Sequence, residues 1–384
     1  MRLRLTLAPL VLLLAGLGAA QTPQATQAKT EIGELNHAKF RIDIPENWNH
    51  GLVVYCHGYS AEPGNVPQKE LPKALAVFVK AGYALIQSGY STGGWAVEQA
   101  IPETEALRHY FIDKYGKPKE TFLTGHSMGG FITMAMMEKF PESYDAALPL
   151  CGPLASSSWF MQRYAFDLRV VFDYYFPGAL PPPIKIPADY KMNDDLRKSV
   201  KQLLDGKPEY ADLLKRLSGT HNNTDMANGL VFGTFVLKDL QQRAGGNPFD
   251  NRYTIYTGTP DDNTLNDKVQ RYAADPGALN YLERFYTPTG KITRPMLAIH
   301  TTYDPLVSPE IPYMYALLTR QTGKSDLFVQ QYVKHDGHCN ITAEETEQGF
   351  AQLREWKDKG TRPMPGKLVA VAPSSVSTVA KEQK

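Results

Sequence analysis

The order of apolar and polar segments in the 384-residue chain predicts an α/β fold with a mostly parallel central sheet flanked by helices. Short apolar runs, typical of strands buried on both faces, alternate with helix-like runs over residues 31–151 and 294–358. Residues 152–293 interrupt this alternation and are rich in aromatic residues, proline and polar helical stretches. We therefore expect residues 31–151 and 294–358 to form one core, into which residues 152–293 are inserted as a lid or cap.

Each element of the core follows from its local pattern. An alternating segment predicts a half-buried strand over 40–44, and apolar runs predict buried strands at 52–56, 83–86, 121–124, 146–150, 295–300 and 327–333. Helices are expected over residues 71–81, 102–115, 128–140 and 311–318. A final helix begins after Thr342, where Thr342 and Glu345 fit a capping box, and ends at Gly360.

The first 20 residues have the pattern of a secretory signal peptide. Arg2 and Arg4 precede an apolar stretch over residues 5–20, which ends in small residues and is short for a membrane-spanning helix. The alternative is an uncleaved N-terminal anchor. Residues 21–30 predict a flexible linker, and residues 361–384 predict a disordered tail. We expect a secreted or periplasmic protein with no stable membrane insertion after cleavage.

Charge and cysteine content exclude several classes of protein. The formal net charge is +1, from 41 basic and 40 acidic side chains, and no long run carries one sign. This balance does not indicate a nucleic-acid or membrane-surface partner. The three cysteines exclude a disulfide-rich scaffold, and their spacing does not fit a zinc module. No cofactor or metal is implied, and the sequence does not indicate an oligomeric state.

Two segments fit the pattern G-x-S-x-G, in which a serine lies on a sharp turn between a strand and a helix. Ser127 directly follows a predicted strand and directly precedes a predicted helix, and Gly129 and Gly130 allow close packing in the first turn. Ser91 also follows a strand, but Gly93 and Gly94 delay the next helix. The context favours Ser127 as the nucleophile and places Ser91 in a loop beside the site.

A serine nucleophile needs a histidine base and an acid that orients it, in the chain order serine, acid, histidine for this strand–turn–helix arrangement. Asp304 follows the predicted strand at 295–300, and His338 follows the one at 327–333, so both are expected at the carboxyl edge of the sheet. His335 is the alternative base, and Asp336 is a weaker alternative acid. The joint arrangement predicts a triad of Ser127, His338 and Asp304.

Two backbone amides and several lid residues complete the predicted site. The developing oxyanion needs two donors, and we expect the amide of Met128, directly after the nucleophile, and that of Tyr59, after strand 52–56. Ser91, in the loop beside the site, is a candidate substrate-binding residue. Trp159 and Tyr164 are further candidates, because lid aromatics would line a pocket for an apolar or aromatic acyl group. The alternative is that the lid aromatics form the lid's own core.

These residues carry a resemblance to a known family. The motif Gly125-His126-Ser127-Met128-Gly129-Gly130, with His57-Gly58, Asp304 and His338, resembles the α/β-hydrolase superfamily of serine hydrolases. The resemblance covers the core segments and implies the fold and the triad, but no particular substrate. Residues 88–95 and the His338-Cys339 pair are also similar to secreted esterases of the tannase and feruloyl-esterase type. In that group a cysteine before the nucleophile bonds one after the histidine, whereas residue 126 is a histidine here.

Cys339 has another candidate partner in this chain. Cys151 follows the predicted strand at 146–150, and a Cys151–Cys339 disulfide would tie the histidine loop to the core. The alternative is three unpaired thiols.

The sequence thus predicts an exported serine hydrolase that cleaves a small-molecule carboxylic ester through an acyl-enzyme intermediate. A peptidase of aminopeptidase type with the same triad is one alternative. A non-catalytic secreted binding protein on the same fold is the other, and it would be expected to have a broken triad.

Overall fold

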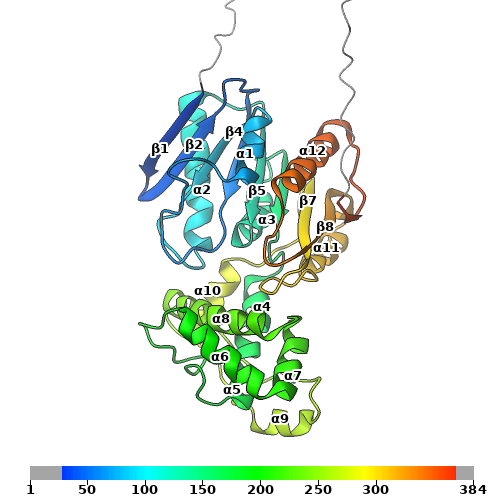
Figure 1. The fold of residues 1–384 in the computed structure, drawn as a ribbon. Helices are drawn as coiled ribbons and strands as arrows, with labels where there is room; N and C mark the ends of the chain where they lie inside the picture. Colours follow the sequence, from blue (N-terminus) through cyan, green and yellow to red (C-terminus); the bar gives the residue numbers. More distant parts are fainter. Residues whose placement is uncertain (1–27, 369–384) are drawn as a thin grey trace, which may run out of the picture.

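The computed structural model describes residues 28–368, in which a sheet of nine strands forms the centre of the core (Figure 1). The strand order is β1-β2-β4-β3-β5-β6-β7-β8-β9. β1, β2 and β4 pair antiparallel and all other neighbours pair parallel, which confirms the predicted mostly parallel sheet. The strands are β1 (Lys29–Leu35), β2 (Ala38–Ile44), β3 (Gly51–Cys56), β4 (Ala84–Ser88), β5 (Glu120–His126), β6 (Ala146–Leu150), β7 (Met296–Tyr303), β8 (Phe328–Asp336) and β9 (Gly366–Lys367).

Helices cover both faces of this sheet. One face carries α1 (Lys73–Lys80) and α12 (Ala343–Lys359), which pack against each other over a buried cluster that includes Phe78 and Phe350. The other face carries α2 (Val97–Tyr115), α3 (Met128–Lys139) and α11 (Pro312–Gln321), and a short 3-10 helix, η2 (Ser325–Leu327), precedes β8. The strands are buried on both faces because helices lie above and below them, as their apolar runs predict.

The segment between β6 and β7 contains helices and no strand in the structure, and it forms a body at one end of the core (Figure 1). α8 lies at its centre and contacts α6, α7, α10 and η1. The buried cluster on the α3 face of the sheet continues into this lid. The lid elements are α4 (Ser157–Met161), the π-helix η1 (Gln162–Asp167), α5 (Leu168–Tyr175), α6 (Asp194–Gly206), α7 (Pro208–Ser218), α8 (Asn223–Ala244), α9 (Asp262–Lys268) and α10 (Pro276–Arg284).

Polar contacts from α8 hold the lid against the loop that follows β4. Asp239 Oδ2 accepts a hydrogen bond from the Trp95 amide at 2.7 Å, and Asp239 Oδ1 pairs with Arg243 Nε at 2.9 Å. Arg243 also donates to the carbonyl oxygen of Gly93. The Trp95 indole N–H donates to Ser157 Oγ at 2.9 Å, at the start of the lid. The same loop residues thus fix two separate parts of the lid relative to the sheet.

The predicted linker is wrong at its last residues. Lys29 and Thr30 were expected in the linker over 21–30, but they begin β1, which pairs antiparallel with β2. Thr30 Oγ1 donates to Asp43 Oδ1 at 2.9 Å, and Glu31 accepts hydrogen bonds from Tyr110 and Lys114 of α2. These partners stabilise the short polar strand. They lie elsewhere in the sequence, so the local pattern of the strand does not predict it.

The predicted disordered tail is also wrong at its start. Residues 361–368 continue along the edge of the sheet, where β9 pairs with β8. The Gln331 side chain donates to the Met364 carbonyl oxygen at 2.9 Å, and the Leu368 amide donates to the Tyr332 carbonyl oxygen at 2.9 Å. The predicted signal peptide, the linker before residue 28 and the tail beyond residue 368 lie outside the described residues. Between residues 28 and 368 no helix is long and apolar enough to cross a membrane.

The capping box of α12, predicted from the sequence, gives a test of local stability. Thr342 Oγ1 accepts the Glu345 N–H at 3.2 Å, and the Glu345 carboxylate accepts the Thr342 N–H at 2.9 Å. Thr342→Ala removes an acceptor for an otherwise unpaired helix N–H, so the free energy of unfolding should fall by about 1 kcal/mol. Urea unfolding measures this, with Thr361→Ala as the control, because Thr361 is exposed and caps no helix. An equal loss in both variants would contradict the assigned role of Thr342.

Candidate active site

Ser127 lies on the turn that joins β5 to α3. Its φ of 55° and ψ of −123° are unusual for a residue other than glycine, and they match the sharp turn expected from the motif. Gly125 and Gly129 permit this turn, because a Cβ at position 125 would lie 2.4 Å from the Gly129 carbonyl oxygen, and one at 129 would lie 1.9 Å from that of Cys56. The turn therefore places the serine at the carboxyl edge of the sheet.

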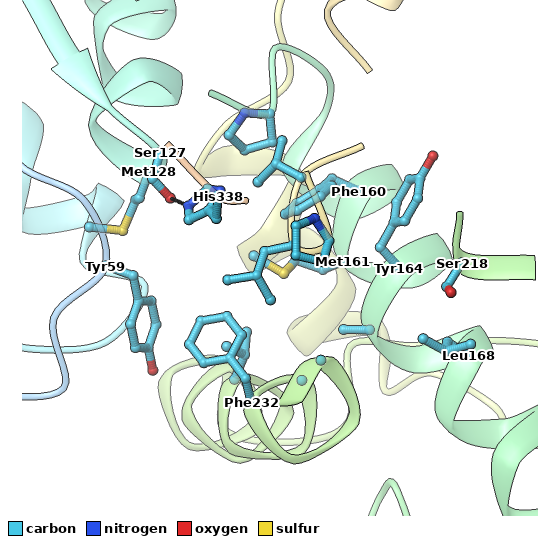
Figure 2. A pocket seen from close by; sticks show the side chains of 18 of the residues that line it. Tyr59, Ser127, Met128, Phe160, Met161, Tyr164, Leu168, Ser218, Phe232 and His338 are labelled. Atoms are coloured by element: carbon cyan, nitrogen blue, oxygen red, sulfur yellow. Dashed lines mark hydrogen bonds between the residues drawn. The ribbon is translucent and has the colours of Figure 1, made fainter. Parts of the chain in front are cut away.

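Hydrogen bonds connect Ser127, His338 and Asp304 in the predicted order, and Figure 2 shows the one between Ser127 and His338. Ser127 Oγ lies 2.8 Å from His338 Nε2, and His338 Nδ1 lies 2.7 Å from Asp304 Oδ2. With the Nδ1–H donating to the carboxylate, Nε2 is available to accept the serine proton. Ser127 and His338 are 211 positions apart in the chain, so this contact depends on the complete core.

Asp304 is held as a carboxylate by its surroundings. The residue is 4% exposed, and its Oδ1 accepts the amide N–H groups of Leu306 and Val307 at 2.9 Å each. Burial alone would raise the pKa of Asp304, but hydrogen bonds from His300, His338 and the Val307 amide hold this pKa well below its ordinary value. An ionised Asp304 fixes the ring orientation and the tautomer of His338.

His300 supports Asp304 and was not singled out by the sequence analysis. Its Nε2 lies 3.4 Å from Asp304 Oδ2 and 2.9 Å from the Val307 carbonyl oxygen, and the residue is 1% exposed. The signal that was available is its position, since His300 ends the predicted strand just before Asp304. The alternative base, His335, lies elsewhere, with its Nε2 3.0 Å from Glu345 Oε1.

Tyr59 and Met128, the predicted oxyanion residues, lie beside the nucleophile. Both line the same cavity as Ser127, and a Cβ built on Gly58 would lie 3.3 Å from Ser127 Cβ. Among the described residues, neither the Tyr59 amide nor the Met128 amide donates to a protein acceptor. Met128 is also the first residue of α3, where the helix dipole favours negative charge. The arrangement therefore offers two unpaired donors next to Ser127.

A cavity of about 310 Å³ opens at Ser127 and His338 and extends between core and lid (Figure 2). Figure 2 shows Ser127, Met128 and His338 on one side of it and Tyr164, Leu168 and Ser218 on the other. Most of its lining is apolar, and no aspartate, glutamate, lysine or arginine is among the lining residues. Lid side chains supply much of the apolar surface, among them Phe160, Met161, Leu168, Met226, Phe232 and Val236.

Two of the three predicted substrate-binding residues do not line this cavity. The Ser91 side chain instead donates a hydrogen bond to Glu103 of α2, and its amide donates to the same carboxylate at 3.0 Å. Trp159 is 38% exposed and lies on the outer side of its helix against Tyr164, with ring centres 5.9 Å apart. Tyr164 does line the cavity, and its hydroxyl donates to Glu310 Oε1 at 2.8 Å.

Two of the three cysteines form a disulfide, and the third is a free thiol. Cys151, directly after β6, is bonded to Cys339, the neighbour of His338, so the alternative of three unpaired thiols is wrong. The bond fixes the histidine loop to the strand next to the one that carries Ser127. Cys56 is a free, buried thiol. Nowhere between residues 28 and 368 do three His, Cys, Asp or Glu side chains group together in a way that could hold a metal ion.

The chain belongs to the alpha/beta hydrolase fold family, whose model matches residues 51–339. The hydrogen-bonded Ser127, His338 and Asp304 all lie within the matched residues, and together with this membership they indicate a hydrolase. The narrower resemblance to tannases and feruloyl esterases stays a prediction.

Individual relatives are distant. An o-phthalyl amidase of Xanthobacter agilis is 27% identical over 175 residues. The matched region covers 43% of this chain and only 36% of the amidase. Among solved structures, an esterase of Pyrococcus furiosus is 14% identical with a TM-score of 0.42, and the match covers 87% of this chain and 89% of the esterase. Est1E of Butyrivibrio proteoclasticus is 13% identical with a TM-score of 0.44, covering 85% and 98% of the two chains.

His126, between Gly125 and Ser127, makes stability depend on pH. Burial lowers the pKa of His126 to about 4, and nearby His338 acts in the same direction. The unfolded chain binds a proton at residue 126 near its ordinary pKa of about 6.5, whereas the folded protein does not until about pH 4. We therefore expect stability to fall as the pH is lowered through this window.

The corresponding variant is His126→Gln, which cannot take up the proton. Urea unfolding at about pH 7.5 and about pH 5 should show a smaller loss of stability at the lower pH than in the wild type. His109→Gln is the matched control, because its side chain is 66% exposed, and it should behave like the wild type. An unchanged pH dependence in His126→Gln would count against the assignment.

Proposed function

We propose that the protein is an exported serine hydrolase that cleaves carboxylic esters with an uncharged, apolar group. The observation that carries this proposal is the pair of hydrogen bonds Ser127–His338–Asp304 at the mouth of an apolar cavity. A serine with a histidine on its hydroxyl and a buried carboxylate behind the histidine is the arrangement that nucleophilic acyl transfer requires.

In the acylation half of the reaction, Ser127 Oγ attacks the ester carbonyl carbon. Nε2 of His338 takes the serine proton, and the resulting imidazolium is stabilised by Asp304. The amides of Tyr59 and Met128, which donate to no acceptor among the described residues, bind the tetrahedral oxyanion. When the intermediate collapses, the C–O bond of the ester breaks and His338 returns the proton to the leaving alcohol. Ser127 is left as an acyl ester.

In the deacylation half, water takes the place of the alcohol. His338 Nε2 removes a proton from the water, and the resulting hydroxide attacks the acyl carbon of the Ser127 ester. The same two amides bind the second oxyanion. Collapse breaks the bond to Ser127 Oγ, which regains the proton from His338, and the carboxylic acid product is released. The enzyme returns to its starting state, and neither half of the reaction uses a cofactor.

The lining of the cavity supports a neutral substrate. An isolated charge moved into this apolar space would lose hydration without gaining a partner, since no acidic or basic side chain of Asp, Glu, Lys or Arg lines it. A peptidase that anchors a chain terminus next to the scissile bond needs such a partner within this cavity. The cavity therefore favours an ester with an apolar arm over the aminopeptidase alternative, and the intact triad arrangement favours an enzyme over a binding protein.

Amide hydrolysis is a second candidate, supported by the similarity to an o-phthalyl amidase. The same triad performs it if His338 protonates the leaving nitrogen.

Export is part of the proposal and rests on two observations. The first 20 residues fit a signal peptide, and the Cys151–Cys339 disulfide belongs to an oxidising compartment. Recovery of the mature protein outside the cytoplasm, with a new N-terminus after residue 20, is the expected result of cell fractionation.

Ser127→Ala tests the nucleophile. Without Oγ no acyl-enzyme forms, so kcat for a p-nitrophenyl ester should fall by at least about 10⁴-fold. Ser91→Ala is a matched control, because Ser91 sits in the other G-x-S-x-G segment and faces Glu103 rather than the cavity. It should retain most of the activity. Ser127→Ala protein that still turns over the ester would refute the proposal.

A substrate panel tests the charge and bond preference. Esters with a neutral apolar acyl group should be hydrolysed with a kcat/KM at least about a hundredfold above esters of the same size that carry a carboxylate or ammonium group on the acyl arm. Matching p-nitroanilides separate esterase from amidase, and slower turnover of the anilides is expected. Preference for a substrate with a free amino terminus would favour the peptidase alternative instead.

A further inference from the structure

A second cavity, of about 270 Å³, adjoins the one at Ser127. The two share three lining residues, Tyr164, Leu168 and Ser218, which therefore form the boundary between them. In Figure 2 these three lie on the side of the first cavity that is away from Ser127. The second cavity thus lies next to the first, beyond these three residues, and its lining includes the exposed Ile255.

The walls of the two cavities differ in chemistry. The second is lined by Arg163, Asp167, Thr254, Tyr256 and Thr257, together with apolar side chains, whereas the first has no charged aspartate or arginine in its lining. A substrate that extends past the boundary would therefore meet the side chains of aspartate and arginine only at its far end.

The π-helix η1 gives the second cavity its carboxylate. A π-helix pairs residues five apart, and this brings the Gln162 side chain onto Asp167, where Nε2 donates to Oδ1 at 2.9 Å. The Tyr256 hydroxyl donates to the same Oδ1 at 3.0 Å. Asp167 Oδ2 has no hydrogen-bond partner among the described residues, although the residue is only 5% exposed and lines the cavity. A largely buried side chain thus keeps one accessible oxygen that can accept a hydrogen bond from a ligand.

We propose that this second cavity is a distal subsite that binds a hydroxyl group at the end of the apolar arm of the ester, with Asp167 Oδ2 as the acceptor. The inference rests on the proposed function, because it extends the substrate that Ser127 cleaves. The substrate is then bipartite, with an apolar stretch next to the scissile bond and a hydroxyl-bearing end beyond Tyr164.

The charges around the subsite favour a hydroxyl over an ion. Arg163 lies at the same cavity, forms no ion pair among residues 28–368, and disfavours an ammonium group. The Arg271 guanidinium is also close, bonded to the carbonyl oxygens of Asn251 and Thr254. The open oxygen of Asp167 in turn repels a carboxylate. A neutral hydroxyl donates to Asp167 and has lone pairs left to accept from Arg163.

The test compares two esters of equal length that differ only at the far end. One series of p-nitrophenyl esters carries a terminal hydroxyl on the acyl arm and the other a terminal methoxy group, over increasing acyl lengths. A parallel series places the same groups on the alcohol arm. A methoxy oxygen cannot donate to Asp167, so at lengths that reach the subsite kcat/KM should favour the hydroxyl by about tenfold in one of the two series. Burial raises the pKa of Asp167 to about 6, so the assay is run at about pH 8, where the carboxyl is ionised.

Asp167→Asn should change the preference between hydroxyl and methoxy esters. The two donors on Oδ1 will hold the amide oxygen of Asn in that place, which turns the amide N–H₂ toward the cavity in place of Oδ2. The variant then offers a donor that both hydroxyl and methoxy oxygens accept, so the preference for hydroxyl should disappear. Asp195→Asn, an exposed change on α6 of the lid, should keep the wild-type preference.

The possible results distinguish failure of the distal subsite from failure of the proposed esterase function. Equal rates for hydroxyl and methoxy esters at every length in wild-type protein would overturn the subsite while leaving the esterase intact, and this comparison does not depend on any variant folding. A hydroxyl preference that survives in Asp167→Asn would assign it elsewhere and also overturn the subsite. Failure to cleave any ester of either series would remove both the proposed function and the subsite.

Discussion

The close approach of backbone at the Ser127 turn is the constraint on which the rest of the site depends. α3 starts so near to β3 that position 129 has no room for a side chain beside the Cys56 carbonyl oxygen. This contact sets where the first turn of α3 lies, and therefore where the Met128 amide and the Ser127 hydroxyl lie relative to the loop at Gly58. A strained φ at Ser127 is tolerated because the strand before it and the helix after it are both fully packed.

The lid supplies much of the cavity wall but none of the three triad residues. Ser127, His338 and Asp304 all come from core segments, whereas the apolar walls of the cavity come largely from α4, η1, α5 and α8. Asp239 of α8 does not line the cavity, but it accepts the amide N–H of Trp95, which does, so the shape of the cavity depends on this polar contact. A family member with another lid would keep the same reaction and accept a different substrate, which is why the fold alone names no substrate.

The core and the triad residues could be predicted because each depends on local pattern and on strand order. Ser127, Asp304 and His338 each follow an apolar run, and parallel strands deliver their carboxyl ends to one edge. Ser91 and Trp159 could not be placed, because a short loop and a helix of five residues are too short for a periodicity that shows which way a side chain points. β1 and β9 were missed for a related reason, since their pairing is stabilised by partners such as Tyr110 and Gln331 that lie far away in the sequence. Asp167 depends on a π-helix, which sequence pattern does not reveal.

The disulfide has a consequence for what happens to the protein after proteolysis. Cys151 and Cys339 are separated by 188 positions, and the whole lid lies inside the loop that they close. Closing a loop of this length removes entropy from the unfolded chain worth about 5 kcal/mol in the simple chain model. A protease that cuts a lid loop once would then leave two pieces joined by a covalent bond. The piece with Ser127 and the piece with Asp304 and His338 would stay together in one molecule, although the polypeptide between them was broken.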